Sequence, residues 1–162
     1  MSQEEFKKKV SDLAFRYETE FHGCSQAVLL AFQEALGLKD DLLFRAAGTL
    51  AGGMYSGLTC GALTGGLLVI GTRVGRRRIE DGLEGLLESF EPAQRLVKWF
   101  EVEYGTTSCR ELTGTDWFDI NQVMLFLRSS DKLKECAKRV GKTAEKVAEI
   151  ITEMDERSGS QS

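Results

Sequence analysis

Apolar side chains recur every three or four positions along most of the chain, with polar and charged residues between them. Phe6, Val10, Leu13 and Tyr17 begin this pattern, which is typical of an amphipathic helix with one buried face. No alternating run of apolar and polar residues has a useful length, so we expect little or no sheet. The spacing predicts helices over residues 6–17, 25–36, 42–47, 60–74, 92–104, 120–127 and 133–154, with a short helical turn at 108–112.

Local signals mark the ends of these helices. Asp40 and Asp41 are suited to cap the third helix, and Pro92, the single proline, fits the first turn of a later one because its missing N–H is not needed there. No repeat or linker divides the chain. We therefore expect an all-α fold, a single-domain helical bundle over residues 1–157, followed by a disordered tail over 158–162.

The stretch from residue 46 to residue 72 has no charged residue and contains eight glycines. A transmembrane span with a small-residue packing face has this composition, but Gly52 and Gly53 interrupt the helix. The unbroken apolar piece that remains, 58–70, is shorter than the roughly 20 residues that a bilayer requires. We expect a glycine-rich, buried central helix whose glycines let neighbouring backbones come close, and no membrane span.

Four cysteines, Cys24, Cys60, Cys109 and Cys136, are too far apart in sequence for a local redox or zinc motif. The first three fall at predicted helix N-termini, where free backbone N–H groups and the helix dipole favour a thiolate and lower its pKa. Cys136 lies on the apolar face of the last helix and is expected to point inward. We expect the four sulfurs to converge, with Cys60 in a pair close enough for a disulfide.

Charge and composition narrow the function classes. The formal net charge of −4 gives no electrostatic reason to expect nucleic-acid binding. The first residues lack the apolar run of a secretory signal, so we expect a cytoplasmic protein, in which cysteines are core residues, catalytic thiols or metal ligands more often than permanent disulfides. His22, the only histidine, stands beside Gly23 and Cys24 as a proton donor, a ligand or a plain surface residue.

Four fragments of the sequence together resemble one known family. They are Gly23-Cys24-Ser25-Gln26-Ala27-Val28, the run Cys60-Gly61-Ala62-x-x-Gly65, Ser108-Cys109-Arg110-Glu111-Leu112 and the late Cys136. They are similar to the C_GCAxxG_C_C family, which is named for this order of cysteines and glycines. The resemblance implies that the four sulfurs are the functional residues and that their chemistry is redox.

Two functional interpretations follow. A third interpretation is a helical scaffold in which the cysteines are only core residues. In the first, the chain is a thiol oxidoreductase without a cofactor, in which Cys60 attacks, Cys24 is the first candidate to resolve, and a redox partner protein or a small thiol exchanges electrons with them. In the second, the four cysteines bind zinc or an iron–sulfur cluster. Backbone N–H groups at Gly61, Ala62 and Gly65 are candidate contacts to a bound anion or sulfur. The glycine-rich helix and the long last helix also suit a homodimer.

Overall fold

The computed structural model describes residues 1–160, and all of its regular elements in that range are helices or helical turns. Every helix that the sequence predicts is present, so the all-α prediction is confirmed. The elements are α1 (Gln3–Phe21), α2 (Cys24–Ala35), α3 (Asp41–Ala47), the turns η1 (Gly48–Leu50) and η2 (Gly53–Gly57), α4 (Gly61–Val74), the turn η3 (Ile79–Asp81), α5 (Gly82–Leu87), α6 (Phe90–Tyr104), α7 (Cys109–Thr113), α8 (Ile120–Leu127) and α9 (Ser130–Ser160).

Side-chain caps explain where several helices begin. Ser2 and Glu5 form a reciprocal capping box at α1, and Asp40 accepts a hydrogen bond from the Leu43 N–H at α3. Asp119 caps α8 in the same way, and Ser108 caps α7 through the Glu111 N–H. These bonds satisfy backbone N–H groups that have no partner inside the helix.

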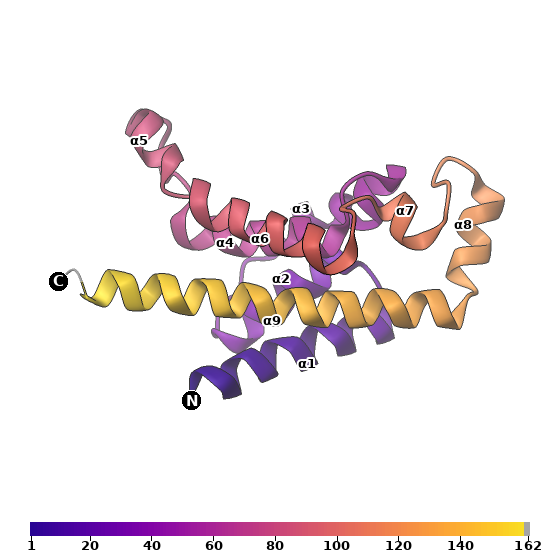
Figure 1. Ribbon diagram of the computed structural model, residues 1–162, viewed down its shortest axis with the longest axis horizontal. Coiled ribbons are helices and arrows are strands. Elements are labelled where there is room, and N and C mark those ends of the chain that lie inside the picture. The colour runs from indigo at the N-terminus through magenta and orange to yellow at the C-terminus, as the bar shows by residue number, and fades with distance from the viewer. Residues whose placement is uncertain (161–162) are drawn as a thin grey trace.

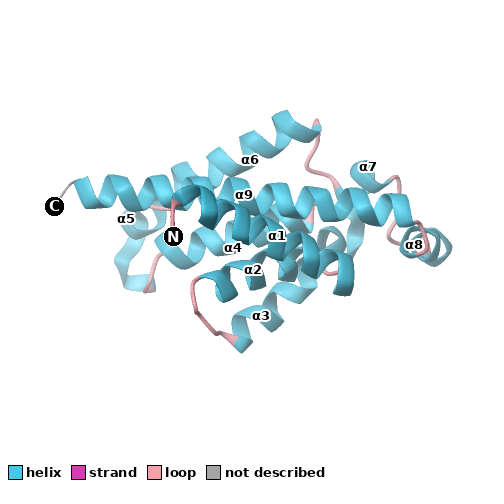
Figure 2. Cartoon of the chain, turned by 90° about the horizontal axis from the view of Figure 1, so that it is seen from below, coloured by secondary structure: helices cyan, strands magenta, loops and turns pink. Residues whose placement is uncertain are grey.

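The helix α9 runs along the whole molecule, with α1 beside it and α4 and α6 on its other side (Figure 1). The helix α2 packs against both α1 and α4, and Figure 2 shows α3 and α6 on opposite sides of this central layer. The short helices α7 and α8 lie at the N-terminal end of α9, whereas α5 lies towards its C-terminal end (Figure 1).

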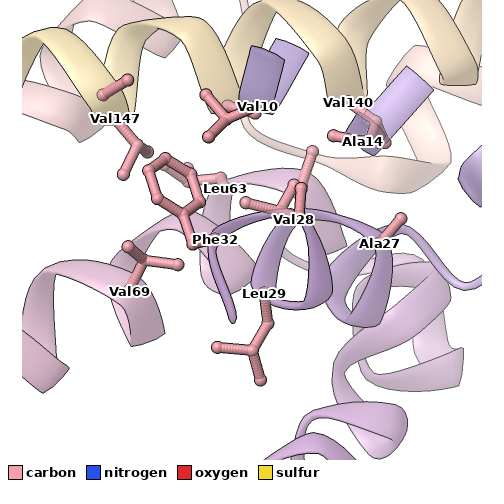
Figure 3. Packing of buried hydrophobic residues seen from close by; sticks show 14 of the residues in the cluster. Val10, Ala14, Ala27, Val28, Leu29, Phe32, Leu63, Val69, Val140 and Val147 are labelled. Carbon is pink, nitrogen blue, oxygen red and sulfur yellow. The ribbon is translucent and has the colours of Figure 1, made fainter. Parts of the chain in front are cut away.

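The hydrophobic core fills the space between α1, α2, α4 and α9. Val10, Phe32, Leu63 and Val147 come from these four helices in turn and point toward one another (Figure 3). All four are almost fully buried, and burial of each such side chain contributes about 1.5–3 kcal/mol.

Close backbone contact at α4 confirms the prediction of a buried, glycine-rich central helix. A Cβ atom at Gly65 would lie 2.6 Å from the Ser25 carbonyl oxygen, so only glycine allows α2 to approach this closely. Gly71, near the other end of α4, has no such neighbour within 4 Å. Among the helices of residues 1–160, none combines the length and the apolar character needed to cross a bilayer.

Two features differ from the sequence-based expectation. The last helix continues through Ser158, Gly159 and Ser160, so the predicted tail is wrong for these three residues. Residues 161 and 162 of that tail lie outside the described residues. The second difference is η2, where Gly52, Gly53, Met54 and Tyr55 are four successive residues with left-handed backbone angles.

Candidate functional site

All four cysteines line one cavity of about 420 Å³ at the N-terminal end of α9. Residues of α1, α2, α4, α7, α8, α9 and the segment around η2 form its wall. Each sulfur belongs to a different helix terminus or face, so the fold alone brings them together. Cysteines separated by as many as 112 residues, from Cys24 to Cys136, therefore line one cavity.

A short antiparallel bridge places Cys60 next to Cys109. Thr59 and Ser108 form the bridge, and the two cysteines follow them directly. The Cys60 N–H donates to the Thr107 carbonyl at 2.8 Å, and the Cys109 N–H donates to the Leu58 carbonyl at 2.6 Å. Because the backbones of both cysteines take part in this pairing, α4 and α7 begin side by side.

The glycines of the Cys-Gly-Ala-x-x-Gly run place Cys24 next to Cys60. A Cβ atom at Gly61 would overlap the Cys24 sulfur, and one at Gly65, one turn later, would overlap the backbone of Ser25. The Ser25 hydroxyl donates to the Ala47 carbonyl at 2.7 Å and holds this end of α2 in place. The two glycines therefore let the first turn of α2 contact the first turns of α4.

The three predicted helix N-termini are confirmed. Cys24 is the first residue of α2, Cys60 is the N-cap of α4, and Cys109 is the first residue of α7. Cys136 lies on α9 and lines the cavity, as its place on the apolar face predicts.

The expectation of lowered thiol pKa values is wrong. Burial is the largest effect at every cysteine, and it raises the pKa of Cys109 to about 12, that of Cys136 to about 11 and that of Cys24 well above its usual range. A thiolate loses more by leaving water than it gains from the helix N-terminus. The four thiols are therefore protonated in this conformation at neutral pH.

Cys60 has the most groups that favour its thiolate. Burial raises its pKa, but backbone hydrogen bonds from Ala62 and Leu63 and the positive charge of Arg139 oppose that rise. A charge on Cys60 also raises the pKa values of Cys24, Cys109 and Cys136, so it acts on all three other thiols. Of the four cysteines, Cys60 is therefore the one whose charge affects the pKa of each of the others.

Two buried charged residues of the cavity wall are not among the candidates predicted from the sequence. Glu18 on α1 is 6% exposed, and Arg139 on α9 is 8% exposed. Burial raises the pKa of Glu18 to about 7. A signal for both was available, because Glu18 follows Val10 and Ala14 on the apolar face of α1 and Arg139 lies one turn from Cys136 on that of α9.

Three buried polar atoms of the described residues have no hydrogen-bond partner, and all three belong to residues of this cavity. They are Glu18 Oε2, Arg139 Nε and Trp117 Nε1. An unpartnered buried polar group costs about 1–3 kcal/mol, so such groups are rare in folded proteins. Their concentration in one cavity leaves three polar atoms free to bond to water or to a ligand that enters it.

The left-handed turn forms another part of the cavity wall. A Cβ atom at Gly52 would lie 2.7 Å from Cζ3 of Trp117, so the indole is seated directly on this glycine. Met54 and Tyr55 also have positive φ angles, which cost a side-chain-bearing residue about 1–2 kcal/mol each. Strained backbone of this kind is concentrated at functional sites.

The remaining candidates have distinct positions. His22 follows the last residue of α1. It is exposed and lies at the edge of the cavity lining. Ala62 lines the cavity and its N–H reaches the Cys60 sulfur, whereas Gly61 and Gly65 lie at the contact between α2 and α4.

The four cysteines are free thiols. Within residues 1–160, no group of three or more histidine, cysteine, aspartate or glutamate side chains is arranged to hold a metal ion. The four sulfurs share a cavity without the close grouping that zinc or an iron–sulfur cluster requires.

Comparison with known proteins finds one family. Residues 22–150 match the family model described as "Putative redox-active protein (C_GCAxxG_C_C)". No curated protein and no solved structure matches the chain. The matched span holds all four cysteines and both glycines of the contact between α2 and α4.

Proposed function

The chain belongs to the C_GCAxxG_C_C family, and we propose that it carries out thiol–disulfide exchange with Cys60 as the attacking thiol. The observation that carries the proposal is the convergence of four free thiols in one cavity around Cys60. Of the four, Cys60 has the most neighbouring groups that stabilise a thiolate.

The reaction needs a proton acceptor, because the thiols of this conformation are protonated. Glu18 lines the same cavity, and its pKa of about 7 suits a group that accepts and returns a proton near neutral pH. In the proposed first step, Glu18 takes the Cys60 proton and the thiolate attacks one sulfur of a disulfide substrate. The substrate S–S bond breaks, a mixed disulfide forms on Cys60, and the leaving thiolate takes up a proton.

Cys24 is the proposed resolving thiol. Its sulfur contacts the backbone at Gly61, the residue that follows Cys60. In the second step Cys24 loses its proton and attacks the Cys60 sulfur, which releases the second substrate thiol. The net change is two protein thiols oxidised to one disulfide and one substrate disulfide reduced to two thiols. A cellular thiol of low potential then returns the protein to its reduced form.

Disulfide mapping tests this proposal. Fully reduced protein, prepared without oxygen, is oxidised with one equivalent of 2,2′-dithiodipyridine, and the disulfides are located by mass spectrometry of peptides. We expect a bond between Cys24 and Cys60 in the wild type and in the Cys136→Ser variant, and none in Cys60→Ser.

Two results would contradict the proposal. One is oxidation of Cys60→Ser to the same extent as the wild type. The other is purified protein that contains stoichiometric zinc or iron and loses it on replacement of any one cysteine, because the four sulfurs would then be metal ligands.

A further inference from the structure

Arg139 is a buried positive charge without a negative partner. Its Nη1 lies 3.7 Å from the Cys136 sulfur, its guanidinium lies 5.4 Å from the centre of the Tyr104 ring, and its Nε has no partner. The ion pairs of the described part of the chain do not include it. Buried arginines in proteins are nearly always paired with an anion.

The thiols around Arg139 do not supply that anion. Burial raises the pKa values of Cys60, Cys109 and Cys136 above their usual range, so these thiols are neutral at physiological pH. Glu18 is in the same cavity, but burial alone accounts for its raised pKa, and no attraction from Arg139 offsets it. The missing negative charge therefore has to come from a molecule that enters the cavity.

The other residues of the cavity wall indicate the chemistry of the rest of that molecule. Trp117 Nε1 is a second buried donor that needs an acceptor. Most of the remaining wall is apolar, and it includes Leu112, Ile120, Val123, Phe126 and Leu133. A ligand that fits has a negatively charged group with several acceptor atoms and an apolar body.

The depth of the sulfurs sets an upper limit on the size of the ligand. Cys60 and Cys109 are each only 6% exposed, so a disulfide on the surface of a folded protein does not reach them. A cavity of about 420 Å³ is in the range that encloses a small organic molecule.

We propose that the cavity binds a small amphipathic anion, with its carboxylate or a similar group on Arg139 and its apolar body against the wall of α7, α8 and α9. This inference extends the proposed function, since it makes small anionic disulfides or thiols the substrates of Cys60. The binding itself does not depend on any thiol chemistry.

A set of three ligands with the same tail tests the proposal on the reduced wild-type protein. Octanoate, 1-octanol and octylammonium are titrated by calorimetry at pH 6, where Glu18 is mostly protonated because its pKa is about 7. We expect octanoate to bind about ten- to a hundred-fold more tightly than the other two, the range expected of a hydrogen bond to a charged group. Equal binding of octanoate and octylammonium, or no binding of octanoate, would overturn the proposal.

The Arg139→Gln variant assigns the effect to one side chain. Its affinity for octanoate is expected to fall to that of 1-octanol, while 1-octanol binds as it does to the wild type. The matched control is Arg128→Gln, which changes an exposed arginine at the end of α8 and should leave both affinities unchanged. Unchanged octanoate binding in Arg139→Gln would contradict the proposal. If that variant does not fold, the comparison of three ligands on the wild type still decides.

Different results would contradict the anion site and the thiol mechanism. Exchange with the neutral 2,2′-dithiodipyridine without octanoate binding would remove the anion site and leave the thiol mechanism intact. Octanoate binding without any disulfide between cavity cysteines would contradict the thiol mechanism and leave the anion site intact.

Discussion

Within the described residues, buried polar side chains of the helical core all have hydrogen-bond partners, whereas three side chains of the cysteine cavity each keep a buried polar atom without one. In the core, the fully buried Ser25 and Thr143 hydroxyls donate to the carbonyls of Ala47 and Arg139, each at 2.7 Å. In the cavity, Glu18, Arg139 and Trp117 each keep a buried atom without a partner. The core therefore satisfies its own buried polar groups, while the cavity wall keeps three polar atoms open to a molecule that enters it.

Packing is also more complete in the core than at the cavity. Phe100 is fully buried, belongs to the core cluster and packs on Trp99 and Tyr104, whereas Phe126 packs on Trp117 and lines the cavity. A side chain beside open space has fewer neighbours to lose when it is truncated. The comparison leads to three predictions about stability, given in order of expected size.

Truncation of one phenylalanine in each region should separate them most clearly. Phe100→Ala is expected to lower the free energy of unfolding by about 3–5 kcal/mol, the usual cost of a new cavity in a packed core. Phe126→Ala should cost clearly less, because one side of this ring already faces space. Urea denaturation measures both, and equal costs would mean that the cavity end is packed as tightly as the core.

The second prediction concerns the pH dependence that Glu18 introduces. Burial raises the pKa of Glu18 from 4.5 to about 7, so in this interval the folded chain keeps a proton that the unfolded chain releases. The stability from that proton is fully present below pH 4.5 and is lost as the pH rises through 7. Glu18→Gln has no such proton, so its stability relative to the wild type should increase by about 3 kcal/mol over this range.

Unfolding in urea at several pH values between 4.5 and 8 measures the effect. The control is Glu20→Gln, an exposed position near the end of the same helix, which should show no trend of this size. A flat difference between Glu18→Gln and the wild type would show that the Glu18 carboxyl is solvated rather than buried.

The third prediction compares two glycines of α4. Gly65→Ala should destabilise the protein by about 1–3 kcal/mol, because the new Cβ meets the backbone of Ser25 and α2 must shift. Gly71→Ala meets no atom within 4 Å and should stabilise the helix by up to about 1 kcal/mol. If both variants gain stability, the close contact between α2 and α4 is absent in solution.

The parts of the fold that depend on local sequence are predictable. Capping by Asp40 and the position of Pro92 in the first turn of α6 follow from neighbours within a few residues, and so do the helix N-termini at Cys24 and Cys109. The thiol pKa values are not predictable in this way, since burial by distant segments outweighs the helix N-terminus.

The site itself depends on contacts that leave little trace in the sequence. The bridge between Thr59 and Ser108 is a single residue pair separated by 49 positions, and no alternating strand pattern in the sequence predicts it. Glu18 and Arg139 were predictable in principle, as charged residues on otherwise apolar helix faces. The left-handed turn at Met54 and Tyr55 was not, because neither residue type favours positive φ angles.

Trapping of the mixed disulfide on Cys60 identifies the attacking thiol. Reduced Cys24→Ser protein is mixed with 2,2′-dithiodipyridine, and the site of the added thiopyridyl group is read by mass spectrometry of peptides. Because the proposed resolving thiol is missing, the thiopyridyl group should accumulate on Cys60, whereas wild-type protein under the same conditions should carry a disulfide between Cys24 and Cys60. Accumulation on Cys109 or Cys136 with none on Cys60 would show that Cys60 is not the attacking thiol.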